Sequence, residues 1–168
     1  MRKLIMLGGL PRSGKSTHAL ALSAEARAPI VNPDSIRIAL HGEDYNQRAE
    51  PYVWAIARTM VHALFIAGHE IVILDAVNNT RKRRDEWKRY DDLYERYFIH
   101  VDTSVSECIR RAKGNPKLTP IIERMHSQHE PATMDEGFVD VKRTSEENNR
   151  PAPLKMTRDD QSMRWLKS

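Results

Sequence analysis

The stretch GLPRSGKST, residues 9–17, decides which folds this chain can adopt. Gly9 and Gly14 bracket four residues, and Lys15 and Ser16 follow the second glycine directly. An apolar run precedes the stretch and a helical spacing follows it, so the loop is expected to join a strand to a helix. Glycines let successive backbone N–H groups point at an anion, and the positive end of a helix dipole favours negative charge there. The stretch is therefore typical of a phosphate-binding loop (P-loop).

Short apolar runs recur along the chain and alternate with stretches of helical spacing. The runs that predict strands are 3–8, 29–32, 70–75, 97–102 and, more weakly, 137–141. The stretches that predict helices are 15–26, 35–41, 49–67, 81–93 and 105–112, with a further helix near Leu118 for which Thr119 suits the N-cap and Pro120 the first turn. Strands that alternate with helices predict an α/β fold with a parallel sheet and right-handed crossovers.

The chain reads as one domain followed by a tail. Residues 1–141 hold every expected strand and helix, and 168 residues are enough to bury one core. Residues 142–168 are polar, proline-broken and without clear periodicity, so we expect them to be extended over the surface or partly disordered. The sequence leaves the oligomeric state open.

Composition narrows the class of protein. No apolar run approaches the ~20 residues that span a bilayer, and the N-terminal apolar stretch is too short for a signal peptide. A single cysteine, Cys108, excludes an internal disulfide and a cysteine metal cluster. The net charge of +4 favours polyanionic partners. We expect a soluble, cytoplasmic protein, in the host cytoplasm if a phage encodes it, with no membrane partner.

The P-loop supplies most of the expected nucleotide site. Lys15 would bridge the terminal phosphates and Ser16 would ligate Mg²⁺. Asp75 ends the third expected strand, where its carboxylate would reach the same magnesium, although Asp also commonly closes strands as a turn residue. The residues expected to bind the nucleotide are Gly9, Ser13, Gly14, Lys15, Ser16 and Thr17, with ATP and Mg²⁺ as cofactors.

Asp34 follows the second expected strand, and Pro33 is expected to keep the chain extended there. In an open parallel sheet, Lys15, Asp34 and Asp75 would lie around one crevice at the carboxyl edge. A carboxylate that accepts the proton of an attacking hydroxyl is what a kinase needs beyond its phosphate cradle. Asp34 is therefore our candidate general base, with a helix N-cap as the alternative. Arg37, one turn later, would face the same crevice.

Four stretches together carry a resemblance to a known family: GLPRSGKST, NPDSIR, ILDAVNNTRKRR, and PIIERM with EPATMDEGFVDV. Over roughly residues 2–142 the chain resembles the kinase domain of bacteriophage polynucleotide 5′-kinase and its small P-loop relatives. The resemblance implies a P-loop NTPase fold with an adenylate-kinase-like five-stranded parallel sheet, flanking helices and a small basic lid. By position it implies that Asp34 activates the acceptor hydroxyl and that Arg37 grips the acceptor's phosphate. Asp75 and Asn78 match the acidic strand end and the asparagine that follows it.

The resemblance also implies a lid residue that stabilises the transferring phosphoryl group. The candidates in CIRRAKGNPK are Arg110, Arg111, Lys113 and Lys117, of which we choose Arg111 because lysine cannot reproduce the planar fork of arginine. This loop differs in length from the family pattern.

Two further patterns have competing interpretations. The basic run 81–84 is either a solvated helix face or a contact for nucleotide or nucleic-acid phosphates. His126 and His129, spaced by three, suit one helix face, but without a third ligand a solvated helix end is favoured over a metal site.

The sequence favours an ATP-dependent kinase that phosphorylates a hydroxyl of a polynucleotide, DNA or RNA. The acceptor is either a 5′-hydroxyl end or the hydroxymethyl group of a modified pyrimidine in phage DNA, for which Tyr45, Tyr52 or Trp54 would line a pocket. One alternative is a kinase for a nucleoside, sugar or antibiotic. Another is a P-loop ATPase or switch module that docks a partner through its tail.

Overall fold

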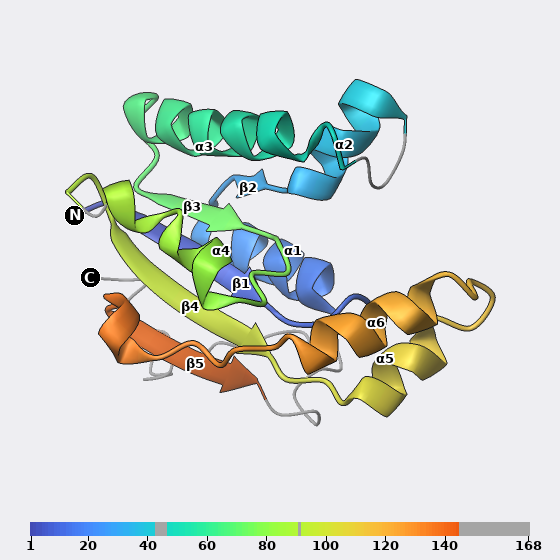
Figure 1. Cartoon of the computed structure of the whole chain (residues 1–168). Coiled ribbons are helices and arrows are strands. Elements are labelled where there is room, and N and C mark those ends of the chain that lie inside the picture. The colour runs from blue at the N-terminus through green and yellow to red at the C-terminus, as the bar shows by residue number, and fades with distance from the viewer. Residues whose placement is uncertain (43–46, 91, 145–168) are drawn as a thin grey trace.

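All five strands run parallel in one sheet. The computed structural model describes residues 1–42, 47–90 and 92–144, and the sheet has the order β2-β3-β1-β4-β5 (Figure 1). The strands are β1 (Lys3–Gly8), β2 (Ile30–Val31), β3 (Ile71–Leu74), β4 (Glu95–Val101) and β5 (Asp140–Thr144). The predicted five-stranded parallel sheet flanked by helices is confirmed. The first residues of the expected tail, 142–144, lie in β5, so the predicted boundary at 141 falls within a strand. The remaining tail residues, 145–168, lie outside the described residues, and so does Tyr45.

Helices cover the sheet on both faces because each central strand is apolar on both sides. In β1, Leu4 and Met6 join one core cluster, while Ile5 and Leu7 join another. The first cluster includes Trp87 and the buried side of α3 (Glu50–Ile66); the second includes the buried side of α1 (Lys15–Ala26). Side chains alternate along a strand, so a strand buried on both faces reads as an unbroken apolar run.

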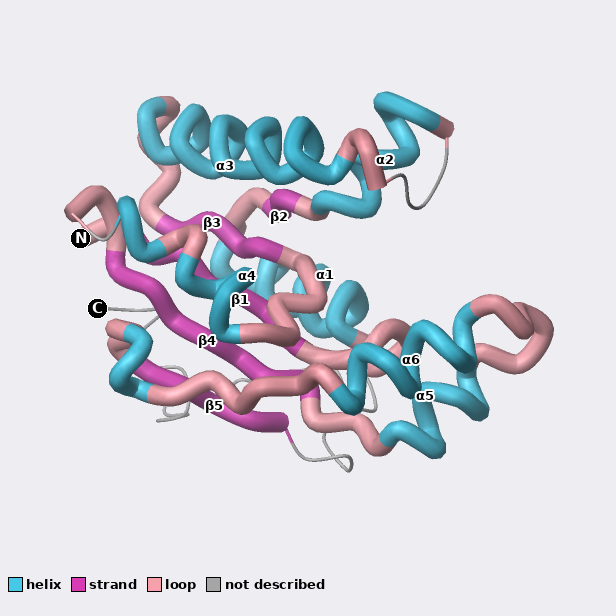
Figure 2. Tube along the Cα trace, viewed as in Figure 1, coloured by secondary structure: helices cyan, strands magenta, loops and turns pink. Residues whose placement is uncertain are grey.

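The strand arrows point toward the side on which two further helices project (Figure 1). These are α5 (Val105–Arg111) and α6 (Leu118–Ser127), and α2 (Pro33–His41) stands on the other side of the same edge. Loops gather at the ends of the strands along this edge, as Figure 2 shows. In the described part of the chain, no helix combines the length and apolar character needed to cross a membrane.

The cap of α2 differs from the sequence prediction. Asn32 is the N-cap, and its side chain accepts a hydrogen bond from the backbone N–H of Ser35 at 2.9 Å. Pro33 is the first helical residue and does not keep the chain extended. Asp34 lies inside the first turn, so the interpretation of Asp34 as the N-cap is wrong.

Three other element boundaries also differ from the predictions. The expected helix 81–93 is instead a short α4 (Arg81–Asp85) and a 3₁₀ turn, η1 (Lys88–Tyr90), because the fully buried Trp87 interrupts it with an N–H bond to the Arg84 carbonyl. Helix α6 starts after Lys117, which caps it without a side-chain bond, so Thr119 is not its cap. The fifth strand begins at Asp140, later than predicted, because Phe138 packs into the core before it.

The basic run 81–84 is divided: Arg81 and Lys82 are exposed, as on a solvated face, whereas Arg83 is partly buried and Arg84 is buried. Arg84 is fully buried, and its guanidinium makes two hydrogen bonds of 2.8 Å to the buried carboxylate of Glu136, in η2 (Met134–Glu136). The same guanidinium also donates to the carbonyls of Asn78, Glu130 and Pro131. Arg84 therefore joins α4 to the segment that leads from the lid to β5.

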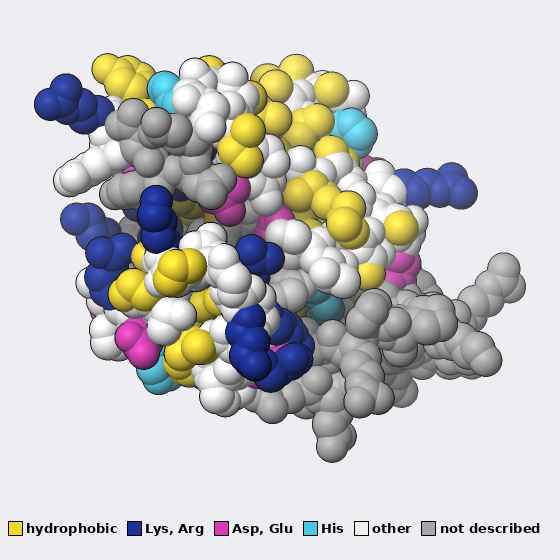
Figure 3. Space-filling view, turned by 90° about the vertical axis from the view of Figure 1, so that its right-hand side faces the viewer, with side chains coloured by type: hydrophobic (Ala, Val, Ile, Leu, Met, Phe, Trp, Pro, Cys, Tyr) yellow, Lys and Arg dark blue, Asp and Glu magenta, His cyan; other side chains and the backbone are white. Residues whose placement is uncertain are grey.

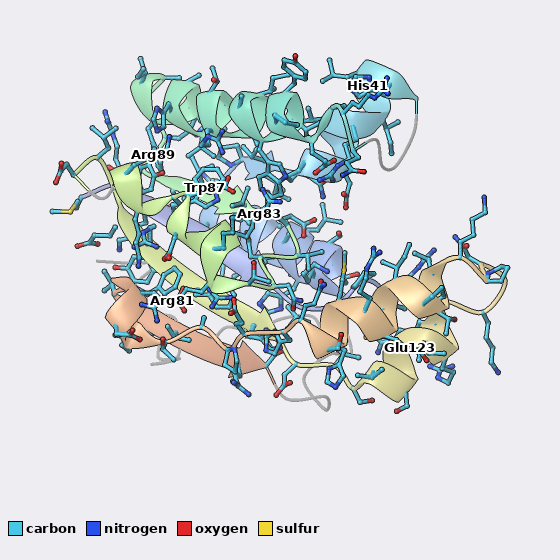
Figure 4. All side chains as sticks on the ribbon, in the orientation of Figure 1. His41, Arg81, Arg83, Trp87, Arg89 and Glu123 are labelled. Carbon is cyan, nitrogen blue, oxygen red and sulfur yellow. The ribbon has the colours of Figure 1, made fainter. Side chains whose placement is uncertain are left out.

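The other two arginines of the run, and a neighbouring tryptophan, are held by side chains around them. Arg81 forms an ion pair of 2.8 Å with Asp135, and in Figure 4 it extends toward β5. Arg83 lies over the ring of Trp54, 4.3 Å from its centroid, and Figure 4 shows Arg83 and Trp87 between α4 and α3. The run therefore joins α4 to α3 and to the segment 130–136, which leads to β5.

The segment after α6 docks on the loop 78–81 through His129. Its Nδ1 lies 2.9 Å from Oδ1 of Asn79, whose amide Nδ2 already donates to the Met125 carbonyl, so the imidazole is the donor. The ring of His100, at the end of β4, packs against His129 with centroids 4.9 Å apart. His126 is exposed, and the described residues hold no group of three or more His, Cys, Asp or Glu side chains suited to a metal ion. Among the described residues the two histidines thus gain no third ligand, and His129 contacts Asn79 instead.

Arg84→Met is expected to lower the free energy of unfolding by about 3–5 kcal/mol, because it leaves the Glu136 carboxylate buried without its partner. Replacing both partners, as R84M/E136L, should recover much of this loss. Chemical denaturation measures both. Arg81→Met is the matched control: its ion pair is exposed, so the unfolding midpoint should barely move. Equal midpoints for R84M and R81M would contradict the assignment.

Stability is expected to fall as the pH falls from 7 toward 4. Burial, with the nearby His129, lowers the pKa of His100 to about 4 from an ordinary value of 6.5. Between these values the unfolded chain binds more protons than the folded protein, so acid favours unfolding. Thermal melts of His100→Phe should lose part of this pH dependence, whereas His41→Phe, at an exposed position on α2, should keep it. Identical slopes for H100F and the native protein would rule out this contribution.

Candidate active site

The P-loop is shaped by close backbone packing against β4. A Cβ on Gly9, at φ 137°, would lie 2.8 Å from the Val101 carbonyl, and one on Gly8 would lie 2.3 Å from Cζ of Phe98. Gly14, at φ 99°, is the N-cap of α1 and carries no side chain to occupy the first N–H groups of that helix. Those N–H groups are what an anion would bind at this terminus.

Lys15 is buried in this loop, with 8% of its surface exposed. Its Nζ donates to the Leu10 carbonyl at 2.8 Å. Burial lowers the pKa of this ammonium, while the carboxylates of Asp75 and Asp34 oppose the shift. The structure thus brings these three charged groups together at the carboxyl edge of the sheet.

Ser16 and Asp75 form the oxygen-rich part of the site. Ser16 Oγ donates to Oδ2 of Asp75 at 2.7 Å, and Asp75 is 4% exposed. Asn32 Nδ2 donates to the same carboxylate oxygen at 2.8 Å while its Oδ1 caps α2. A hydroxyl and a carboxylate are ligands that Mg²⁺ prefers, so these residues fit a magnesium ion.

Asn32 is a site residue that the sequence reasoning missed. Asn32 stands between an apolar run and a proline, and this position in the sequence is typical of a helix N-cap.

Asp34 and Arg37 meet on α2, but Arg37 has a second partner. Arg37 Nη1 donates to Oδ1 of Asp34, and its Nε and Nη2 donate to the two carboxylate oxygens of Glu50 at 2.5 and 2.8 Å. The Arg37 side chain is 10% exposed and that of Asp34 is 70% exposed. Arg37 thus pairs with two carboxylates, of which that of Asp34 is exposed to solvent. Sequence reasoning missed Glu50.

The lid contacts the P-loop through Arg111. Arg111 Nη1 donates to the carbonyls of Arg12 at 3.3 Å and Ser13 at 3.2 Å, and its Nε donates to Glu107 at 2.6 Å. Glu107 also holds Arg110, and hydrogen bonds from the two arginines lower the pKa of Glu107 to about 2. The lid base is therefore an ordered charge cluster.

Two other candidates for the lid, and one residue outside it, complete this region. Lys113 and Lys117 are exposed on the turn between α5 and α6.

Thr103 anchors the P-loop from the end of β4, because its Oγ1 donates to the Ser13 carbonyl at 2.8 Å. Seen from the side of the lid, Lys and Arg side chains gather over part of the described surface, with a few acidic side chains among them (Figure 3).

Asn78 is a buried residue that bonds to the backbone of β1. Asn78 is 2% exposed, its backbone has a φ of 45°, and its Nδ2 donates to the Leu7 carbonyl at 2.7 Å. It therefore supports the strand that leads into the P-loop.

The aromatic residues expected to line a pocket lie apart: Trp54 is buried in the core and Tyr52 is exposed on α3. Cys108 is fully buried in the small core of the lid, as expected for an unreactive thiol.

Comparisons with known proteins find solved structures with a similar fold. The chain is similar to part of the Pnkp1/Rnl/Hen1 RNA repair complex, with 25% identity and a TM-score of 0.63, over 76% of this chain and 43% of that chain. It is also similar to the APS kinase CysC of Mycobacterium tuberculosis in complex with AMPPNP and APS, at 15% identity and a TM-score of 0.64, covering 99% and 96% of the two chains. A gluconokinase of Sinorhizobium meliloti is 19% identical, with a TM-score of 0.55 and 84% of each chain covered.

The chain thus spans less than half of the matched chain of the RNA repair complex. No curated protein matches it. The model of the AAA_33 family, described as an AAA domain, matches residues 4–131. This match covers most of the chain and includes the P-loop, Asp34 and Asp75. The chain therefore belongs to the AAA_33 family of AAA domains and has a P-loop kinase fold.

Proposed function

We propose that this protein is an ATP- and Mg²⁺-dependent kinase that phosphorylates a hydroxyl of a polynucleotide. The observation that carries the proposal is the exposed carboxylate of Asp34, which accepts a hydrogen bond from Arg37 and lies near enough to Lys15 to oppose the lowering of the Lys15 pKa. A P-loop alone would serve a motor or a switch equally well. An exposed, oriented carboxylate beside it supplies the base that transfer to an alcohol requires.

The residues around the P-loop have the chemistry needed to bind ATP and Mg²⁺. The N–H groups at the start of α1 and the Lys15 ammonium would hold the terminal phosphates of ATP. Ser16 and Asp75 would hold Mg²⁺, which would neutralise charge on those phosphates. The Lys15 ammonium donates one N–H to the Leu10 carbonyl and has further N–H donors for phosphate, whose negative charge would favour the charged form of Lys15.

The transfer step follows from these positions. The acceptor oxygen forms a bond to the γ-phosphorus, the bond from that phosphorus to the β–γ bridging oxygen breaks, and ADP leaves. Asp34 takes the proton of the acceptor hydroxyl as the new bond forms. Arg111, which rests on the P-loop carbonyls, is our candidate for stabilising charge on the transferring group.

Two observations favour a polynucleotide acceptor. The chain resembles part of an RNA repair complex over three quarters of its own length, and its net charge is +4. Positive charge attracts a polyanion whatever its sequence. Within this class we propose either a 5′-hydroxyl end of DNA or RNA or the hydroxymethyl group of a modified pyrimidine in phage DNA, with phage origin carried over from the family resemblance.

A small-molecule acceptor is the second candidate, and one observation favours it. Arg37 was expected to bind a phosphate next to the acceptor hydroxyl, yet it is engaged by Asp34 and Glu50. Such a site also suits a nucleoside, a sugar or an antibiotic. A P-loop ATPase or switch module is the outcome in which no acceptor is phosphorylated.

Incubation with γ-labelled ATP and Mg²⁺ tests the acceptor class. We expect label on oligonucleotides with a 5′-hydroxyl or a hydroxymethyl pyrimidine, and none on matched oligonucleotides whose 5′ ends are phosphorylated and whose pyrimidines are unmodified. Free nucleosides, gluconate and aminoglycosides form the small-molecule arm. Label only in that arm would overturn the polynucleotide proposal, and ATP hydrolysis without any labelled acceptor would support the switch module.

The roles of Lys15 and Asp34 are separable by substitution. Asp34→Asn should retain ATP binding and lose about 10²–10⁴-fold in transfer rate, because the amide cannot accept the proton. Lys15→Ala should impair both binding and transfer. Calorimetric ATP titration and single-turnover kinetics measure the two effects. Normal transfer by D34N would remove Asp34 from the mechanism.

A further inference from the structure

Glu50 is the most strongly connected carboxylate near Asp34, although it cannot itself face an acceptor. Both of its oxygens are bonded to Arg37, and Oε2 also accepts a hydrogen bond from Trp54 Nε1 at 3.1 Å. Its side chain is 17% exposed, against 70% for Asp34. Glu50 begins α3 and Arg37 lies on α2, so the contact also joins these two helices.

The consequence for Asp34 is mechanical. The side chain of an exposed aspartate can populate several rotamers. A hydrogen-bond partner selects one of them when the partner's own side chain is fixed in position. Arg37 becomes such a partner because the planar fork is held in two places by Glu50. Trp54, whose ring is buried and lies under Arg83, in turn fixes the orientation of Glu50.

The arrangement also divides the charge of one guanidinium between two carboxylates. Arg37 holds the pKa of Glu50 below its ordinary value, chiefly through their hydrogen bonds. If Glu50 were neutral, Asp34 alone would receive that positive charge and would become a weaker base. Position and basicity of Asp34 thus depend on the same neighbour.

We propose that Glu50 is a positioning residue for phosphoryl transfer, which acts through Arg37 to hold Asp34 oriented and basic toward the acceptor hydroxyl. The inference rests on the proposed kinase function and adds to it a residue on a different helix. It does not require Glu50 to touch ATP or the acceptor.

Glu50→Gln tests the inference because it keeps size and removes charge. We expect kcat to fall by about 10-fold to 100-fold with the KM for ATP unchanged, since a small misplacement of a catalytic group has effects of this order. We also expect the acidic limb of the pH profile of kcat/KM to move to lower pH, because the negative charge of Glu50 no longer competes with that of Asp34 for Arg37. A merely structural role of Glu50 would not move that limb.

Glu86→Gln is the matched control. Glu86 accepts hydrogen bonds from Arg58 at 3.0 Å and Arg83 at 3.3 Å in the same region between α3 and α4. E86Q should keep the native kcat and pH profile. Trp54→Phe, which removes the indole N–H together with part of the ring, should lower kcat by about 2-fold to 10-fold and keeps the inference testable if E50Q fails to fold.

A double-variant cycle separates Glu50 from other effects. Once Arg37→Met has removed the connection, adding E50Q should change kcat no further. A native kcat and pH profile for E50Q and W54F, together with loss of transfer in D34N, would overturn this inference alone. Normal transfer by D34N would instead overturn the kinase mechanism itself.

Discussion

The site depends on a close approach between the P-loop and the strand beside it. Gly8 lies under the Phe98 ring and Gly9 lies against the Val101 carbonyl, at separations that admit no side chain. This approach brings the loop within reach of Thr103, which follows β4, and of Arg111, the last residue of α5. The crowding of two glycines thereby fixes where the lid begins and where an anion would sit at the start of α1.

Two bidentate Arg–Glu pairs do different work in this fold. Arg84 and Glu136 are both fully buried and are surrounded by backbone carbonyls, so they hold elements together. Arg37 and Glu50 make the same fork, but one nitrogen of Arg37 reaches an exposed carboxylate. The chemistry of the pair is the same in both places, and the two pairs differ in their surroundings: the further partners of Arg84 are backbone carbonyls, and that of Arg37 is an exposed carboxylate.

The sheet was predictable because buried parallel strands leave a local trace, an unbroken apolar run such as 3–8. The P-loop was predictable for the same reason, since its residues are neighbours in sequence. Prediction failed where partners are distant. Nothing near Arg84 signals Glu136, 52 residues later, and nothing near Arg37 signals Glu50, 13 residues later.

Local rules also gave wrong boundaries where tertiary packing decided the outcome. The helix expected over 81–93 breaks because Trp87 is buried in the core, and the last strand starts late because Phe138 packs there. At α2 the capping rule was sound but applied to the wrong residue, since Asn32 caps the helix and Asp34 falls in its first turn.

The carbonyl of Ser13 receives one hydrogen bond from Thr103 and another from Arg111. A single peptide unit of the P-loop is thus shared between the rigid sheet and the lid. If the lid swings, Arg111 must release this oxygen or rotate the peptide that carries it. The N–H of the same peptide unit belongs to Gly14, at the start of α1. The position of the lid and the direction of this N–H group are therefore coupled.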